Sequence, residues 1–253
     1  MPPTSLRLYL FIQDEPFYLA AELPPLLKRF PIAGVALFGQ RLPNDSLLKM
    51  LYRYLCLLGP VGFIRMCLTV LCGKITRKGS LLALFKKSEI PCRFVRNMND
   101  PAFIEDVRQS GANLLVSIAC PQIFKNPLIS LGSNGAVNLH GGLLPDFPGA
   151  FTPFWNLYEG AIEAGCTLHY ITDKIDGGDI IGQSRFPITP KDSMLDLYAQ
   201  ITKHGIALLI EQLSAIAEGR VQRRPNVYRQ ERYHTFPTWS EGREFRRKGL
   251  SFF

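Results

Sequence analysis

Two polar side chains in an apolar, extended stretch and one carboxylate further along have the residue types that acyl transfer needs. Asn138 and His140 lie two residues apart in the segment after Gly135, so in a strand both side chains leave the same face. Asp176 comes 36 residues after His140, at a turn marked by the glycine pair that follows it. A hairpin or crossover of this length can bring the carboxylate beside the imidazole.

An amide, an imidazole and a carboxylate can together transfer an acyl group to an amine. A fixed amide donor such as Asn138 can stabilise the negative charge on the carbonyl oxygen, an effect worth about 3 kcal/mol. The His140 imidazole, with an ordinary pKa of about 6.5, can take a proton from the attacking nitrogen and give one to the leaving nitrogen. Asp176 would orient the ring and stabilise its charged form.

Each motif taken singly also has a structural interpretation. His140 can be a hydrogen-bonded core histidine, and Asp176 can be a turn former whose side chain bonds the backbone. No serine or cysteine stands where a nucleophile is needed, because position 142 is Gly142 and Cys166 has no base beside it in the sequence. Direct transfer is therefore favoured over a covalent acyl-enzyme intermediate.

The joint order of these motifs resembles a known family. The stretch 136–145 with Gly149 four residues on, and the stretches 165–170 and 174–181, resemble the signature of the folate-dependent formyltransferases. That family includes methionyl-tRNA, glycinamide ribonucleotide and sugar-nucleotide N-formyltransferases. The resemblance covers roughly residues 90–225, and in architecture the chain looks most similar to the sugar N-formyltransferases.

The resemblance implies a donor and a set of site residues. Asn138, His140 and Asp176 fall on the family's catalytic positions, and the implied one-carbon donor is 10-formyltetrahydrofolate. No metal is implied, since the histidines show no ligand spacing. The implied folate-binding positions are Ser117, Ile118, Ala119, Ile123, Leu144, Pro145, Thr172 and Ile175.

Two segments depart from the family pattern. The loop 142–149, where the acceptor should enter, has no arginine before Gly149. The first strand is followed by Gln13, Asp14, Glu15 and Pro16 in place of a glycine-rich turn, which puts a phosphate-binding role for that turn in doubt.

Apolar runs of strand length alternate with helical patterns along the chain. This order predicts an α/β fold, a Rossmann-like and mostly parallel sheet with helices on both faces, followed by a short basic C-terminal arm. We expect a catalytic domain over 1–219 with a helical apolar insertion near 44–78, and the arm over 220–253. The predicted strands and helices are strands at 6–12, 33–38, 91–95, 114–119 and 136–139, and helices at 18–29, 101–110 and 194–218, the last capped by Ser193 and ended by Gly219.

The cysteine pattern and the N-terminus point to the cytoplasm. The six cysteines show no CxxC spacing and several lie in apolar runs, which is typical of reduced, buried thiols. The apolar run 8–12 is too short for a signal peptide.

The segment 47–72 is apolar and interrupted by Gly59 and Pro60, with Arg53 and Arg65 inside it. A pair of core helices covering the sheet is the favoured interpretation. A transmembrane helix is disfavoured, because Pro60 breaks the run and a central arginine would cost about 3 kcal/mol. An interfacial hairpin on an anionic membrane and an oligomer contact, such as a homodimer, stay open as alternatives.

The last 34 residues, 220–253, hold nine basic and three acidic residues, so +6 of the total charge of +8 lies there. Basic residues interleaved with aromatic ones suit a nucleic-acid surface or a nucleotide-diphosphate pocket, while an arm that packs its aromatics on the main domain is equally compatible. The aromatic residues concerned are Tyr228, Tyr233, Phe236, Trp239 and Phe245.

The leading hypothesis is an N-formyltransferase that acts on a small amine acceptor, with a nucleotide-linked amino sugar favoured. A methionyl-tRNA acceptor is disfavoured, because the residues after Pro225 are too few for the C-terminal domain that such enzymes carry. A lipid-linked amine would give 47–72 a role, with the chain peripheral at the inner membrane face. The alternatives from other classes are a non-catalytic folate-binding protein and a formyl-folate hydrolase.

Overall fold

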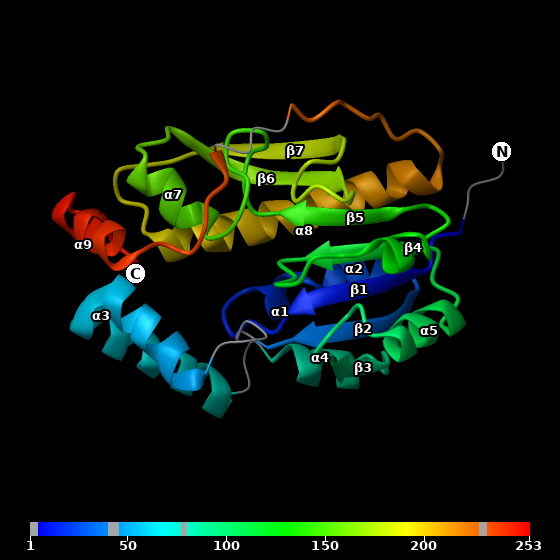
Figure 1. Ribbon diagram of the computed structural model, residues 1–253, viewed down its shortest axis with the longest axis horizontal. Coiled ribbons are helices and arrows are strands. Elements are labelled where there is room, and N and C mark those ends of the chain that lie inside the picture. Colours follow the sequence, from blue (N-terminus) through cyan, green and yellow to red (C-terminus); the bar gives the residue numbers. More distant parts are fainter. Residues whose placement is uncertain (1–4, 40–45, 77–79, 228–231) are drawn as a thin grey trace.

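Strands and helices alternate in the computed structural model, which describes residues 5–39, 46–76, 80–227 and 232–253 (Figure 1). The strands are β1 (Leu8–Gln13), β2 (Ile32–Phe38), β3 (Cys92–Phe94), β4 (Leu114–Ile118), β5 (Ala136–His140), β6 (Glu163–Tyr170) and β7 (Ile180–Pro187). The helices are α1 (Leu19–Glu22), α2 (Pro24–Arg29), α3 (Leu47–Thr76), α4 (Leu81–Lys87), α5 (Pro101–Gln109), α6 (Asn126–Ile129), α7 (Thr152–Tyr158), α8 (Met194–Ala217) and α9 (Trp239–Arg247).

The strands form one sheet in the order β3-β2-β1-β4-β5-β6-β7. The first five are mutually parallel, whereas β6 and β7 run antiparallel to their neighbours. The α/β fold with a mostly parallel sheet is therefore confirmed. The strands β6 and β7 were not predicted, because they carry polar residues such as Glu163, Gln183 and Arg185 in place of a continuous apolar run.

Side chains of successive strand residues enter two separate cores, one on each face of the sheet. In β1, Leu8, Leu10 and Ile12 join the larger core, while Tyr9 and Phe11 join the smaller one. The alternation follows from the two-residue period of a strand, and it requires helices on both sides. The long helix α8 covers the first face and α5 covers the second, as predicted (Figure 1).

The predicted end signals of α8 are confirmed. Ser193 accepts the backbone N–H of Asp196, whose carboxylate in turn accepts the N–H of Ser193, which completes a capping box. Gly219 follows the C-cap with φ 66°, a conformation that glycine adopts without strain. The predicted helix at 18–29 is instead two short helices, α1 and α2, because Pro24 begins a new one.

The structure contradicts the favoured interpretation of segment 47–72. Only 11% of the most apolar stretch of this segment is buried. The helix packs beside α9 at one end of the molecule and not over the sheet (Figure 1). Cys67 and Cys72 on this helix are exposed, so the expectation that the thiols are buried is also wrong for them. Residues 44, 45, 77 and 78 of the predicted insertion lie outside the described residues.

Candidate active site

Strand β5 carries Asn138 and His140 on one face and ends at His140. The strand pairs with β4 in parallel, where Asn138 lies opposite Ser117, and with β6 antiparallel, where it lies opposite His169. His140 is 6% exposed. The residue therefore sits at the carboxyl end of a central parallel strand, the edge at which α/β sheets bind ligands.

Asp176 reaches the same edge from the loop between β6 and β7. Its Oδ1 lies 3.8 Å from His140 Nδ1 and 3.6 Å from His169 Nε2, and its Oδ2 accepts the backbone N–H of Gly149 at 2.8 Å. Burial alone would raise the pKa of this carboxyl, but His140, His169 and the Gly149 N–H outweigh it and hold the pKa well below its usual range. The carboxylate is therefore ionised at neutral pH.

His169 is a member of this cluster that sequence reasoning missed. Its Nδ1 bonds the Tyr170 carbonyl at 2.8 Å, so we assign the proton of the neutral ring to Nδ1. In the neutral ring Nε2 is then an acceptor, and it receives an N–H from Asn138 Nδ2 at 3.1 Å. This bond fixes the Asn138 amide and leaves the second N–H of its Nδ2 for a substrate oxygen. Only the protonated ring presents an Nε2–H to Asp176 and lowers the pKa of that carboxyl.

The loop after β5 folds back over His140. The Phe147 carbonyl accepts the Nε2–H of His140 at 2.7 Å, which fixes the ring orientation. The base of the loop is tied to β6, where Thr167 Oγ1 accepts the Leu144 N–H at 3.0 Å and donates to the Gly142 carbonyl at 2.7 Å. These bonds align the imidazole edge with the Asp176 carboxylate.

Asn226 and His234, from the described part of the C-terminal region, lie on the other side of this loop. Asn226 Nδ2 donates to the Asp176 carbonyl at 2.6 Å, and His234 exchanges backbone hydrogen bonds with Pro148 and Ala150. Gly149 is required between them, because its φ of 100° and the close approach of the His234 carbonyl leave no room for a side chain. The tail therefore braces the residue that hydrogen-bonds Asp176.

Several tail aromatics pack inside the protein. Phe245 is fully buried and stacks on Phe154 at 4.7 Å, and Phe236 meets Phe151 at 4.6 Å. The Phe245 ring cannot contact a nucleotide base, so the ligand-binding interpretation is wrong for it, whereas Phe236 is only half-buried. Trp239 is 55% exposed. Tyr228 lies outside the described residues.

The implied folate-binding positions divide by burial. Ser117, Ile118 and Leu144 are buried, and Pro145 is half-buried. The exposed positions are Ala119, Ile123, Thr172 and Ile175. The eight positions lie at the end of β4, in the loop after β4, in the loop after β5 and in the loop that carries Asp176. Their folate role stays a prediction.

The turn after β1 is already occupied by a carboxylate of the chain. Glu15 is 6% exposed and accepts the backbone N–H groups of Phe17, Tyr18 and Leu19. Burial raises the pKa of Glu15 against these three bonds. The backbone N–H groups that a phosphate would need are therefore already bonded to Glu15. This agrees with the expectation that this turn, which lacks the glycine-rich sequence, does not bind phosphate.

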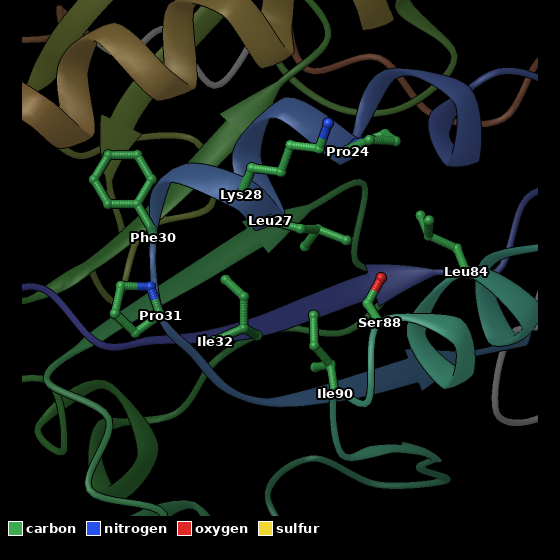
Figure 2. A pocket seen from close by; sticks show the side chains of 9 residues that line it. All are labelled: Pro24, Leu27, Lys28, Phe30, Pro31, Ile32, Leu84, Ser88 and Ile90. Carbon is green, nitrogen blue, oxygen red and sulfur yellow. The ribbon is translucent and has the colours of Figure 1, made fainter.

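Two surface hollows lie away from the cluster. One, of about 300 Å³, is lined by α2, the turn before β2 and the end of α4, as Figure 2 shows. The other, of about 450 Å³, lies beside Gly135, Tyr170 and Arg223. Both open at the amino-terminal edge of the parallel strands, opposite His140. Within the described residues no group of three His, Cys, Asp or Glu side chains could hold a metal ion.

A comparison with protein families decides the membership of this chain. The family described as formyl transferase matches residues 73–213, more than half of the chain. The chain belongs to the formyl transferase family. The matched segment contains β5, β6 and the Asp176 loop, so the predicted resemblance to the folate-dependent formyltransferases is confirmed.

The curated relatives and the solved structures that share the fold differ in the acceptors that their names give. A methionyl-tRNA formyltransferase from Moorella thermoacetica is 33% identical over 136 residues, which are 54% of this chain and 44% of the relative. A glycinamide ribonucleotide transformylase from Symbiobacterium toebii shares the fold with a TM-score of 0.62, 22% identity and coverage of 88% and 94%. An N-formyltransferase from Helicobacter canadensis, solved with folinic acid and dTDP-3-aminofucose, has a TM-score of 0.58, 19% identity and coverage of 91% and 71%.

Proposed function

We propose that this chain is an N-formyltransferase that moves a formyl group from 10-formyltetrahydrofolate to the amine of a small acceptor. The observation that carries the proposal is the buried cluster in which an ionised Asp176 lies within 4 Å of both His140 and His169 while Asn138 is held by His169. Family membership supports the reaction class, and the folinic acid named with the Helicobacter canadensis structure supports the donor class.

The residues have separate roles in this reaction. The free N–H of Asn138 would hold the formyl oxygen as the acceptor nitrogen attacks, in the manner of an oxyanion hole. His140 would accept the proton that the attacking nitrogen sheds and supply one to the folate nitrogen as the carbon–nitrogen bond breaks. For this, Nε2 would have to exchange the Phe147 carbonyl for the substrate nitrogens while the ring proton lies on Nδ1, which faces Asp176. Asp176, ionised and buried, stabilises the positive charge on the His140 ring between these two proton transfers.

For the acceptor we propose a nucleotide-linked amino sugar. The support is the sugar nucleotide named with the Helicobacter canadensis structure, together with basic side chains beside the loop that follows β5. Arg232 pairs with Asp146 of this loop at 3.1 Å, and Arg224 bonds Gln183 on β7 at 2.6 Å. A cytoplasmic location follows from the need for folate and a nucleotide-linked substrate.

Replacing His140 tests the mechanism. We expect His140→Ala to lower turnover by about 10²–10⁴ while folate affinity stays nearly unchanged, because the ring moves protons and does not bind the donor. The measurement is formyl transfer to a panel of nucleotide-linked amino sugars, reading N-formyl product, free formate and tetrahydrofolate separately. His204→Ala, a histidine on α8 outside the cluster, is the matched control.

Other results of this assay would indicate a different mechanism or function. Near-normal turnover of His140→Ala would refute the proton-transfer role. Formate without N-formyl product would identify a hydrolase, and folate binding with neither product would identify a binding protein or a different acceptor.

A further inference from the structure

The helix α3 exposes apolar side chains along both of its halves. In the first half the exposed ones recur at spacings of four and three residues, and in the second at three, four and three, so each half presents an apolar stripe to solvent besides the apolar side chains that it buries. A soluble surface of this length normally carries charged residues on such a stripe. The stripe residues are Leu48, Tyr52 and Leu55 before the kink and Val61, Ile64, Leu68 and Leu71 after it, and Leu47 beside the first stripe is exposed as well.

A kink at Gly59 divides this helix. Gly59 has φ 72° and ψ 171°, and Pro60 follows it, so the residues on either side form two shorter helices. By length and composition 47–72 could cross a membrane as one helix. At 1.5 Å per residue, however, the segments 47–58 and 60–76 are only about 18 and about 26 Å long. Both are shorter than the roughly 30 Å hydrocarbon core, which favours insertion into one leaflet.

The C-terminal residues hold the kink in a fixed position. Gly242 of α9 packs directly on Leu57, where an added Cβ would lie 2.7 Å from the Leu57 carbonyl oxygen. Arg246 donates a hydrogen bond from Nη1 to that same carbonyl, which the kink has released from the helix ladder. Tyr54, one turn before Leu57 on the same face of α3, also meets the protein, and its ring lies 5.6 Å from that of Phe236. The apolar stripes therefore face outward from a rigid base.

The charges on and beside α3 indicate which kind of partner its exposed apolar side chains would contact. Leu47–Thr76 contains no Asp or Glu, and its described basic side chains are Lys49, Arg53 and Arg65. The adjoining segment 239–248 adds four basic residues and two acidic ones. A second copy of this face would bring like charges together, whereas an anionic lipid surface complements them.

From these features we propose that α3 is a monotopic membrane anchor whose two halves lie in one leaflet of a bilayer rich in anionic lipid. The apolar stripes enter the acyl boundary and the flanking basic residues meet the headgroups. Tyr54 also contacts Phe151, two residues after Gly149, at 6.5 Å. Docking through α3 therefore places the loop that hydrogen-bonds Asp176 close to the bilayer surface. The proposal concerns α3 and stands apart from the formyl-transfer reaction.

Vesicle flotation tests the anchor. The purified chain should float with vesicles of equimolar phosphatidylcholine and phosphatidylglycerol, and its affinity for phosphatidylcholine alone should be at least about tenfold lower. The double substitution Leu48→Asp/Ile64→Asp should lower binding to the anionic vesicles by about tenfold or more. Ile162→Asp makes the same change at a side chain that is 83% exposed on another segment, and it should bind like the wild type.

A second variant tests the charges separately from the apolar contact. Lys49→Gln/Arg65→Gln should weaken binding by roughly fivefold for each charge removed, and the loss should fall as salt is added. The proposal is overturned if the wild type floats with neither kind of vesicle, or if Leu48→Asp/Ile64→Asp floats as the wild type does. It is also overturned if the chain is a dimer that this double variant converts to a monomer without any vesicle binding, since a second copy would then be the occupant.

Discussion

At the scale of single residues, the cluster of Asn138, His140, His169 and Asp176 shows how neighbouring strands bring together side chains that lie far apart in the sequence. Asn138 and His140 were identifiable because their two-residue spacing in one strand fixes a common face. His169 was not, since it joins the cluster only through the antiparallel register that places it opposite Asn138. The alternation of Thr167 and His169 on one face of β6 is the signal that would have suggested it, once β6 was known to be a strand.

The low pKa of Asp176 makes a prediction about acid stability. Because the folded-state pKa is depressed, the carboxylate contributes stability that is present above its ordinary pKa of about 3.9 and is lost as pH falls through the folded value. Asp176→Asn should therefore lower the free energy of unfolding by about 1–3 kcal/mol at neutral pH, with a smaller difference below about pH 4. Asparagine tolerates the φ of 50° at this position, so backbone strain is not a second cause.

Urea unfolding of both proteins across this pH range measures the effect. A difference that stays constant into acid would show that the carboxylate's charge is not what stabilises the fold.

At the scale of elements, α9 and α3 depend on each other. The contact of Gly242 with the Leu57 backbone leaves no space for a side chain, and backbone atoms cannot move aside as a flexible side chain could. Gly242→Val should therefore lower the free energy of unfolding by about 1–3 kcal/mol through overpacking. Arg247→Val, at an exposed position of the same helix, should change it by less than about 0.5 kcal/mol.

Chemical unfolding of the two variants beside the wild type makes this comparison. Because valine is a better helix former than glycine, helix propensity cannot cause a loss at Gly242, and a Gly242→Val variant as stable as the wild type would refute the role of the contact with α3.

The position of α3 in the fold could not be predicted from composition. Apolar residues surround this helix on most sides, so the sequence periodicity does not distinguish a face that meets protein from one that meets another apolar medium. By contrast, α8 was predicted with both ends because Ser193 and Gly219 mark them locally. Local signals define an element, while its partner depends on contacts far along the chain.

At the scale of the whole molecule, the C-terminal residues that the structure describes, 226–227 and 232–253, contact both the active-site loop and α3. His234 pairs with the backbone on either side of Gly149, Phe245 fills a core position against Phe154, and Gly242 supports Leu57. The sequence left open whether this segment holds the acceptor or packs on the main domain, because its aromatic spacing is compatible with both. The contacts now favour a structural contribution.

Removing residues 226–253 should accordingly destabilise the protein and weaken both substrates' binding. Loss of a buried phenylalanine alone costs about 3–5 kcal/mol, and the Gly149 N–H that bonds Asp176 would lose its backbone support as well. We expect a lower unfolding temperature and raised KM for both folate and acceptor, measured by calorimetry and steady-state kinetics. Phe245→Ala separates the two contributions, since it removes core packing but leaves Asn226 and His234 in place beside Asp176. A truncated chain that keeps its stability and its folate KM, and loses only acceptor affinity, would instead assign the segment to acceptor recognition.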